Sequence, residues 1–449
     1  MTAQRPLLNP FLAGKPVPPK RFVGRQDALR SIFGRISTGQ SSAVTGAPHI
    51  GKSSFLQYIR DGQVRRAWLG ATEGACAFVD VDCHMVPLSF GPEHFWSYLL
   101  DYVEREFPEQ PVLAAAESAR QNNLLSFALR SLFDLLSRAG KRVILLVDEF
   151  DVLLNHARFN TPDFFGALRS LSTSTDSLAL VAASRMSTAE MNRRGLEITP
   201  LGSPFFNSLT EVQLTPLRPE EVDDLVARTL EGTGVVFTTK DRLYIGRVSG
   251  RHPFLVQLAA GAMFNAAAQG MAEAERFRMV YRTLQRDGRA HFEDMWRHLG
   301  PALQPPVRAL ALAELQGAAE VLQPYEPELH ILADAGLIEP ARPGSKQPLL
   351  AWRGERWRVA AASFARWVAD HAGDAVPPPP QAPLRERLAA AFSLEEIRTL
   401  CADLGVEFED LPGQTREARA QDLIEHCERR GLTHQLLARC RELRPHLTW

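Results

Sequence analysis

A glycine-rich segment near the N-terminus has the spacing of a phosphate-binding loop. It reads G-x-x-x-x-G-K-S, and its residues are Gly46, Ala47, Pro48, His49, Ile50, Gly51, Lys52 and Ser53. Glycines let backbone N–H groups curl around a phosphate, and a helix that follows adds the positive end of its dipole. In this motif Lys52 reaches the β- and γ-phosphates and Ser53 places its hydroxyl on Mg²⁺. We count Ser54, the next residue, with the nucleotide-binding set.

Two adjacent carboxylates provide the second half of a phosphoryl-transfer site. Asp148 and Glu149 follow the apolar run 143–147, which predicts a strand buried on both faces of a parallel sheet. Asp148 would hold the Mg²⁺ shell, usually through water, and Glu149 would orient and polarise the attacking water. Phosphoryl transfer needs mainly positioning and neutralisation of charge, so a lysine, Mg²⁺ and two carboxylates suffice.

The elements that must position these residues alternate between short apolar strands and amphipathic helices. Strands are expected at 42–45, 75–81, 141–147 and 178–183, with helices at 93–107 and 124–139. The pattern predicts an α/β P-loop NTPase with a parallel sheet of the ASCE/AAA type, whose core covers 22–215 after an extended, proline-rich lead-in at 1–21. The mostly helical stretch 216–289 predicts a lid, with helices at 220–230, 240–248 and 253–268.

Residues 290–373 suggest a winged helix. Helices are expected at 307–315, 328–335 and 361–372, and the strands 337–339 and 350–352 flank a turn-rich hairpin tip. The basic residues of this module are Arg342, Lys346, Arg353, Arg356 and Arg358. These basic residues could contact DNA. The helix that would enter the groove, however, has Glu326, Glu328 and Asp334 in or beside it, and DNA phosphates repel these carboxylates. A regulatory hinge packed on the ATPase is therefore the preferred interpretation.

The C-terminal part follows a stiff polyproline linker at 374–383 and predicts a small all-α domain at 384–449. Ser393 and Glu396 have the spacing of a helix capping box. Acidic residues gather in the first half of this domain and arginines in the second. Faces of opposite sign suit head-to-tail stacking of like domains, although an ordinary solvated bundle gives the same pattern.

Composition narrows the class of protein. The 449 residues are 45% hydrophobic and 23% charged with a net charge of −1, so the chain can bury a core and has no overall field toward nucleic acid or membrane. No run of 18 apolar residues could span a bilayer, and the N-terminus has no signal-peptide core. The five cysteines are odd in number and form no C-x-x-C pair, which favours a reduced, cytoplasmic protein.

The first 290 or so residues resemble the bacterial STAND and AAA-like signalling ATPases. The resemblance rests on the loop, the acidic pair and three further features. The segment Phe22, Val23, Gly24 and Arg25 is similar to their adenine-side box, although alone it could be a helix-capping turn. The strand 178–183 ends where that fold places a γ-phosphate sensor, and the turn 249–253 is similar to one that lays a proline, here Pro253, near adenine.

The resemblance implies further site residues. Arg185 is the first candidate for the sensor and Ser184 the second, unless Arg185 is simply exposed after the strand. The catalytic set is then Glu149, Asp148, Lys52 and Arg185. Arg193 or Arg194 could reach a neighbouring subunit, but a solvated loop pair is the preferred interpretation. Arg251 or His252 could touch phosphate when the lid closes, and His252 could equally cap a helix.

Residues 384–449 resemble the effector-associated, death-like domains of bacterial immune systems, on segments 411–413, 427–431 and 444–445 and the final tryptophan. The two resemblances imply an ATP-dependent switch or scaffold, a weak ATPase if an enzyme at all, that oligomerises and recruits an effector or adaptor carrying a similar domain in bacterial defence or programmed cell death. No protease or nuclease motif is visible. The alternatives are an AAA+ ATPase acting on DNA and a static ATP-binding adaptor. The long repeat array that most STAND proteins use as a sensor is missing, so the sequence does not name the trigger.

Overall fold

The computed structural model describes residues 8–198, 205–316, 325–341, 350–352, 355–371, 384–413, 415–430 and 432–444. It divides into two compact units, Met1–Trp367 and Val368–Trp449, and each unit is considered by itself. The predicted linker 374–383, most of the hairpin tip, and the residues Arg342, Lys346 and Arg353 lie outside the described residues, as does the C-terminal segment 445–449.

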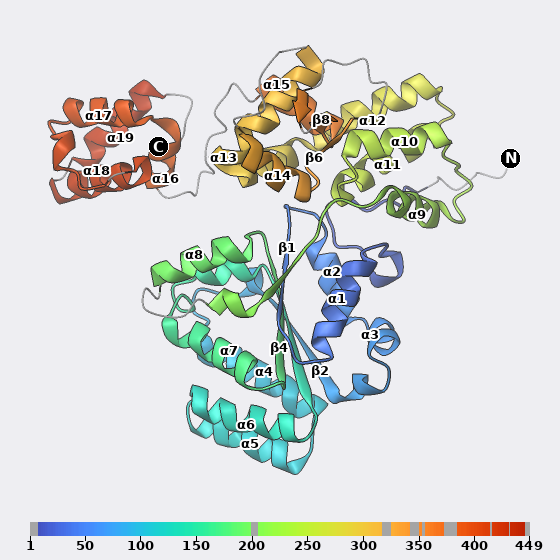
Figure 1. The fold of residues 1–449 in the computed structure, drawn as a ribbon, viewed down its shortest axis with the longest axis vertical. Coiled ribbons are helices and arrows are strands. Elements are labelled where there is room, and N and C mark those ends of the chain that lie inside the picture. The colour runs from blue at the N-terminus through green and yellow to red at the C-terminus, as the bar shows by residue number, and fades with distance from the viewer. Residues whose placement is uncertain are drawn as a thin grey trace. The chain divides into compact units, whose positions relative to one another are not determined.

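A parallel five-stranded sheet forms the centre of the first unit (Figure 1). Its strand order is β2-β3-β4-β1-β5, which confirms the predicted P-loop ATPase fold. The strands are β1 (Ser42–Thr45), β2 (Cys76–Asp82), β3 (Arg142–Asp148), β4 (Leu178–Ser184) and β5 (Thr210–Gln213). Sequence analysis missed β5, because its residues are polar and all but Val212 are exposed.

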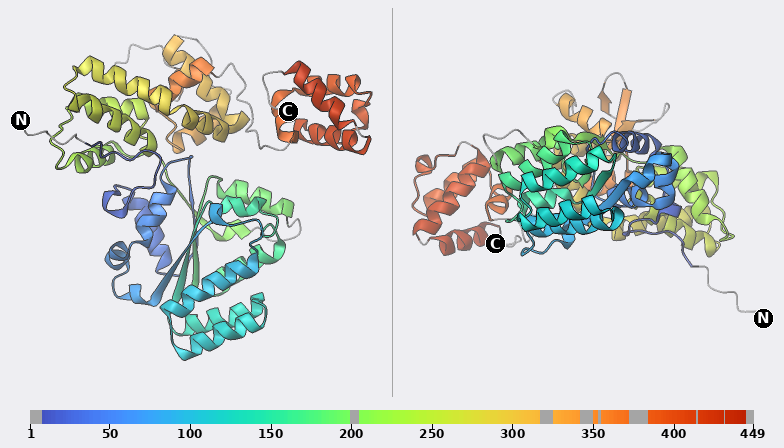
Figure 2. Two further views of the ribbon diagram at one scale, coloured as in Figure 1. Left: turned by 180° about the vertical axis from the view of Figure 1, so that it is seen from behind. Right: turned by 90° about the horizontal axis from the view of Figure 1, so that it is seen from below.

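Helices cover both faces of this sheet, and the alternation of side chains along β3 explains why. Val143, Leu145 and Val147 pack into one core, whereas Ile144 and Leu146 pack into the other. The first core is covered by α4 (Pro92–Glu106), α5 (Gln110–Gln121), α6 (Ser126–Arg138) and α7 (Pro162–Ser174). The second is covered by α1 (Gln26–Ile36), α2 (Lys52–Arg60) and α3 (Gly62–Leu69), so the helices form two layers with the sheet between them (Figure 2).

The rest of the first unit is mostly helical. Beside the sheet lies α8 (Thr188–Ile198), and the predicted lid consists of α9 (Pro219–Leu230), α10 (Thr239–Ser249), α11 (Pro253–Ala268) and α12 (Glu273–Asp287). Then follow α13 (Arg289–Gln316), α14 (Glu326–Asp334) and α15 (Ala362–His371). Helix α13 bends at Gly300, whose φ of 66° is not helical and which precedes a proline.

A small antiparallel sheet joins these last helices. Its strands are β6 (Ile338–Pro340), β7 (Leu350–Trp352) and β8 (Glu355–Val359), in the order β6-β8-β7. The expected hairpin between 337–339 and 350–352 is wrong, because each of these strands pairs with β8 and not with the other. Three of the five β8 residues are charged, so this strand had no apolar run to reveal it.

The second unit contains a small helical bundle. Its helices are α16 (Leu384–Ala391), α17 (Leu394–Asp403), α18 (Arg416–Arg430) and α19 (Thr433–Leu443). The Ser393 hydroxyl accepts the Glu396 backbone N–H at 3.3 Å, and the Glu396 carboxylate accepts the Ser393 N–H at 2.8 Å, which confirms the capping box. The predicted inward face of α18 is buried, and its residues are Ala420, Leu423, Ile424 and Cys427.

Short 3₁₀ turns occur between these elements, at Pro19–Arg21, Gly70–Ala75, Cys83–Met85, Phe150–Asn155, Phe205–Ser208 and Phe408–Asp410. The five cysteines are buried and form no disulfide. Within the described residues, every helix is too short or too polar to cross a lipid bilayer.

Candidate functional site

The strand order brings the predicted loop and the acidic pair to one edge of the sheet. β1 leads into the glycine-rich loop, β3 ends at Asp148, and β4 lies between these two strands and ends at Ser184. Because all three strands are parallel, their carboxyl ends meet at the same edge, which is where ligands of open α/β sheets bind. Arg185 therefore emerges between Lys52 and the two carboxylates.

The loop has the backbone shape that a phosphate cradle requires. Gly46 and Gly51 have φ values of 145° and 102°, and His49 has a left-handed φ of 58°. A Cβ on Gly46 would lie 2.6 Å from the carbonyl oxygen of Leu214, so only glycine fits there. Gly51 precedes the first residue of α2, which places the helix N-terminus directly at the loop.

Lys52 is buried and is held by the loop itself. Its ammonium donates to the carbonyl oxygens of Gly46 at 2.9 Å and Ala47 at 3.2 Å. Burial lowers the pKa of this ammonium, and the nearby Glu149 carboxylate opposes the shift. The positive charge thus lies inside the loop, where a phosphate oxygen would replace the carbonyls as its acceptor.

Ser53 and Asp148 face each other across the predicted Mg²⁺ site. Burial raises the pKa of Asp148, and a side-chain hydrogen bond from Ser53 opposes this shift. A hydroxyl and a carboxylate side by side are the oxygen ligands that Mg²⁺ prefers.

Glu149 and Arg185 form an ion pair above this site. Nε of Arg185 lies 3.1 Å from one carboxylate oxygen and Nη2 lies 3.4 Å from the other. Burial disfavours the charge on Arg185, but the Glu149 carboxylate outweighs that effect and raises the pKa of the guanidinium. Glu149 has a left-handed φ of 52°. Each of these two candidate catalytic side chains is therefore the partner of the other in an ion pair.

The box at 22–25 connects the loop to the lid. Arg25 donates to the carbonyl oxygen of Ile50 at 3.2 Å and to that of Thr215, and its backbone N–H donates to the Glu221 carboxylate at 2.9 Å. Burial lowers the pKa of Arg25 to about 10, which Glu221 partly offsets. A Cβ on Gly24, which has a φ of 71°, would collide with the same carboxylate.

Phe22 and Val23 complete the box by packing. The Phe22 ring stacks on Tyr58 of α2 with 4.4 Å between centroids, and Val23 is buried. Phe22 through Arg25 thus fix the start of α1 against α2 and the lid, whatever contact they make with a base.

The predicted lid contacts the loop from the other side. Nε2 of His252 lies 3.1 Å from the carbonyl oxygen of Pro48, and Pro253 begins α11. The lead-in also contributes, because the Val17 N–H donates to the Ser54 hydroxyl at 3.1 Å. A cavity of about 190 Å³ remains among these elements, lined by Lys52, Ser53, Ser54, Glu149, Arg185 and Pro253 together with residues of the box and the lead-in.

Three histidines meet behind the loop. The His291 ring, from α13, lies 5.2 Å from the His49 ring and 4.7 Å from the His252 ring. Neither ring nitrogen of His291 has a hydrogen-bond partner among the described residues. Burial lowers the pKa of His291 to about 3, and His49 adds to the shift. All three rings are therefore neutral at pH 7, and they join the loop, the lid and α13 through apolar faces.

Some predicted residues lie away from this cavity. Arg193 and Arg194 lie on α8 and not on a loop, and both pair with Glu190, at 3.8 and 3.7 Å. The Ser184 hydroxyl accepts the backbone N–H of Met186 at 2.9 Å, so it caps the end of β4. Arg185 lines the cavity and Ser184 does not.

Sequence analysis missed several residues that shape the site. Val17 and Glu221 contact it through hydrogen bonds, and His291 contacts it through its ring. Glu221 stands three residues after Arg218, and its carboxylate accepts the Arg218 backbone N–H at 2.8 Å at the start of α9. Pro219 and the acidic pair Glu220 and Glu221 could have marked this helix start. Val17 and His291 carry no signal, because a lone valine or histidine far along the chain has no pattern.

The donor set fits a nucleotide with Mg²⁺. The glycine-rich loop, a buried ammonium, a hydroxyl and two carboxylates line one cavity or its edge, and these are the groups that such a ligand requires. Lys52 would hold the phosphates, Ser53 and Asp148 the ion.

Two family models match the chain. Residues 21–181 match the AAA ATPase domain, and residues 384–445 match effector-associated domain 7. The chain therefore carries an AAA-like ATPase domain and a C-terminal effector-associated domain. A comparison with curated proteins finds no match.

Solved structures share the fold of the first unit. The Walker-type ATPase of Pyrococcus abyssi has a TM-score of 0.50 at 14% identity, over 80% of this chain and 99% of that one. The ORC2 protein of Aeropyrum pernix, in its ADPNP–ADP complexes, has a TM-score of 0.42 at 16% identity, over 77% and 93%. Drosophila ORC bound to DNA has a TM-score of 0.41 at 14% identity, over 79% and 88%. The first likeness concerns the fold alone.

Proposed function

We propose that this protein is an ATP-dependent molecular switch or scaffold, which assembles in its ATP-bound form and recruits an effector through its C-terminal domain. An AAA-like ATPase domain and an effector-associated domain in one chain support this proposal. We place the activity in bacterial defence or cell-death signalling, on the resemblance to signalling ATPases described above. ATP hydrolysis, at a low rate, would reset the switch.

The contact between lid and loop is the observation that carries the proposal. His252 of the lid touches Pro48 of the loop, and Arg25 joins the loop to Glu221 of the lid. The cavity beside these contacts, about 190 Å³, is smaller than the roughly 300 Å³ of the smallest usual ligand pockets. Nucleotide binding therefore requires the lid or the lead-in to move, which couples occupancy of the site to the position of the lid.

The chain's own residues then divide the work. Lys52 exchanges its two loop carbonyls for phosphate oxygens, while Ser53 and Asp148 hold the ion. Bound Mg²⁺-ATP supplies the phosphoryl group that is transferred to water. Glu149 orients that water only after Arg185 releases its carboxylate. A bound phosphate would attract Arg185 and break its ion pair with Glu149. The catalytic base would therefore become available only when nucleotide is present.

The second unit supplies the surface for a partner. Arg444 pairs with Glu396 at 2.7 Å and Arg439 with Asp403 at 2.8 Å, so part of the predicted charge asymmetry is neutralised inside the domain. Exposed charges of both signs remain, at Glu395, Glu407, Arg429 and Arg430. These residues would direct head-to-tail contact with a similar domain on a second copy or an effector.

DNA binding through 290–373 is the less favoured function. Arg358, one of the five basic residues of that module, pairs with Glu339 at 2.7 Å and faces the lid. The helix α14 begins with Glu326 and Glu328 and contains no arginine or lysine.

Nucleotide binding tests the first step of the proposal. We expect Lys52→Ala to weaken binding of a fluorescent ATP analogue about 100-fold or more, because it removes a buried charge-assisted contact. Lys240→Ala is the matched control, since this exposed lysine of α10 lies outside the cavity. Equal affinities of the two variants would show that the loop does not bind ATP.

A further inference from the structure

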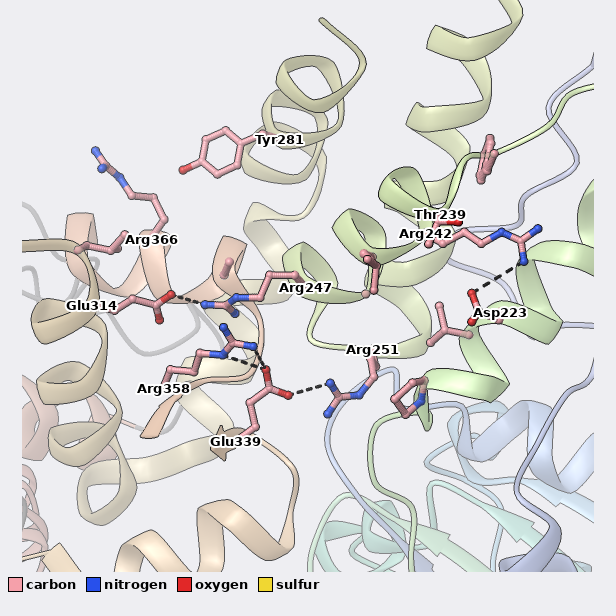
Figure 3. A pocket seen from close by; sticks show the side chains of 17 residues that line it. Asp223, Thr239, Arg242, Arg247, Arg251, Tyr281, Glu314, Glu339, Arg358 and Arg366 are labelled. Atoms are coloured by element: carbon pink, nitrogen blue, oxygen red, sulfur yellow. Dashed lines mark hydrogen bonds and ion pairs between the residues drawn. The ribbon is translucent and has the colours of Figure 1, made fainter. Parts of the chain in front are cut away.

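A second and larger pocket lies on the opposite side of the lid from the loop. Its volume is about 840 Å³, within the roughly 300 to 1,000 Å³ range of small-molecule sites. α9, α10 and α12 of the lid form one wall, and α13, β6, β8 and α15 form the other (Figure 3). Sequence analysis assigned no role to any pocket here.

Positive charge predominates in the lining of this pocket. It contains five arginines and three carboxylates. The arginines are Arg242, Arg247, Arg251, Arg358 and Arg366, and they come from α10, the turn after it, β8 and α15. Guanidinium groups gathered from separate elements recognise phosphate or carboxylate groups through paired N–H donors.

Two of these guanidiniums lie next to each other at the centre of the pocket. Figure 3 shows Arg247 and Arg358 side by side, with Glu314 bound to the first and Glu339 to the second. Burial lowers the pKa of Arg247, and the neighbouring Arg358 contributes to that shift. Adjacent like charges are costly, so an anion placed between them would be favourable.

Donors and an acceptor remain for a ligand. Nη1 of Arg358 and Nη2 of Arg251 have no acceptor among the described residues. Oε2 of Glu314 accepts no hydrogen bond from any described residue, although the Glu314 side chain is only 5% exposed. A buried carboxylate oxygen without a donor is unfavourable, and a hydroxyl or amino group of a ligand would satisfy it. Tyr281 adds an aromatic ring at the rim (Figure 3).

We infer that this pocket binds a small phosphate-bearing molecule of nucleotide size, with phosphate at Arg247, Arg251 and Arg358 and a hydroxyl or amino group at Glu314. The same arginines connect the lid to the module that follows it. Arg247 binds Glu314 and the carbonyl oxygens of Val359 and Ala360, at 3.1 and 2.9 Å, and Arg251 binds Glu339 at 2.7 Å. A phosphate that engages these arginines therefore alters the junction between lid and module.

The ligand would act as the trigger of the switch, and this part of the inference rests on the proposed function. The turn between α10 and α11 explains how the signal would travel. Arg251 contacts the second pocket, and the next residue, His252, contacts the loop at Pro48. Because these two residues are neighbours, a movement of the turn at Arg251 would also shift the contact of His252 with the loop.

Binding is tested by calorimetric titration of the full chain carrying Lys52→Ala, which removes the loop as a competing phosphate site. The probes are inorganic tripolyphosphate and NAD. We expect both to bind, and Arg358→Gln or Arg251→Gln to weaken binding about tenfold or more, since each removes a charged donor. Arg282→Gln is the matched control, because this exposed arginine follows Tyr281 on α12 and does not line the pocket. Glu314→Gln should weaken NAD but not tripolyphosphate.

Melting temperatures of the variants show whether each one folds. Absence of binding by both probes, or equal weakening in the Arg282→Gln control, would overturn the site. Regulation is tested separately, by particle mass of the wild type with an ATP analogue in the presence and absence of NAD. A change in mass with NAD supports the trigger. If NAD binds and the mass is unchanged, the site stands and its role as trigger is wrong, whichever way the ATP analogue acts alone.

Discussion

The two pockets on either side of the lid differ in how they are closed. The loop cavity is small, and its contacts with the lid are a histidine ring on a carbonyl oxygen, three packed imidazoles and the bonds of Arg25 to Ile50 and Glu221. The second pocket is large and is bridged by ion pairs between the lid and the module after it. Apolar contacts resist salt, whereas ion pairs yield to competing anions. A nucleotide would therefore both fill space and take over the contacts of Lys52 and Arg185, whereas the second ligand would act by exchanging charges at the junction.

The largest effect is expected from removing the candidate base of the loop cavity. Glu149→Gln should lower the rate of ATP hydrolysis about 100-fold or more, because a general base of this kind contributes that much. ATP should still bind, and ATP-dependent assemblies should persist longer than those of the wild type. Hydrolysis by steady-state phosphate release measures this, with Glu190→Gln on α8 as the control. Unchanged hydrolysis and assembly would favour the static adaptor.

A smaller effect is expected at the turn that the two pockets share. Gly250 has a left-handed φ of 57°, and a Cβ there would lie 2.6 Å from the backbone nitrogen of Ala361. Gly250→Ala should therefore lower the free energy of unfolding of the first unit by about 1 to 3 kcal/mol, and should disturb binding in both pockets. Chemical denaturation gives the first quantity.

Gly270→Ala separates backbone strain from the close approach. Gly270 has a similar φ of 69°, but a Cβ there would meet nothing within 4 Å. Gly270→Ala should lower the free energy of unfolding by only about 1 kcal/mol and leave binding in both pockets unchanged. Equal costs at the two glycines would mean that the junction at Ala361 is not tightly packed.

The smallest effect concerns the dependence of stability on pH. The pKa values of His49, His252 and His291 are lowered in the folded chain, chiefly by burial, so the unfolded chain binds more protons as the pH falls below about 6.5. The stability that these three neutral histidines contribute is fully present above that pH and is lost as the pH decreases toward 3. The charged groups that act on this cluster are Lys52, Arg185, Arg25, Glu149 and Asp294.

His291→Phe should reduce this loss, because it removes one proton-binding group and keeps an apolar ring. Melting temperatures between pH 8 and pH 5 measure the effect. An identical pH profile in the variant and the wild type would exclude His291 as a source of this loss.

Most of the sheet and of the loop cavity could be predicted from local pattern. Lys52, Ser53, Asp148 and Glu149 stand at fixed distances from apolar strands, and a short motif reveals such residues. The second pocket could not be predicted, because its arginines are spread from Arg242 to Arg366 and meet only through tertiary packing. Glu339 and Arg358 had no sequence signal beyond their charge, and the pairing of β6 with β8 that brings them together was also missed.

Particle mass in solution tests the central claim, that nucleotide sets the state of assembly through the loop and the lid. The wild type and Lys52→Ala are measured with ADP and with a slowly hydrolysed ATP analogue. The account predicts a large assembly only for the wild type with the ATP analogue, and a smaller particle in the other three samples. The same mass for the wild type with both nucleotides, or a large assembly of Lys52→Ala, would contradict it.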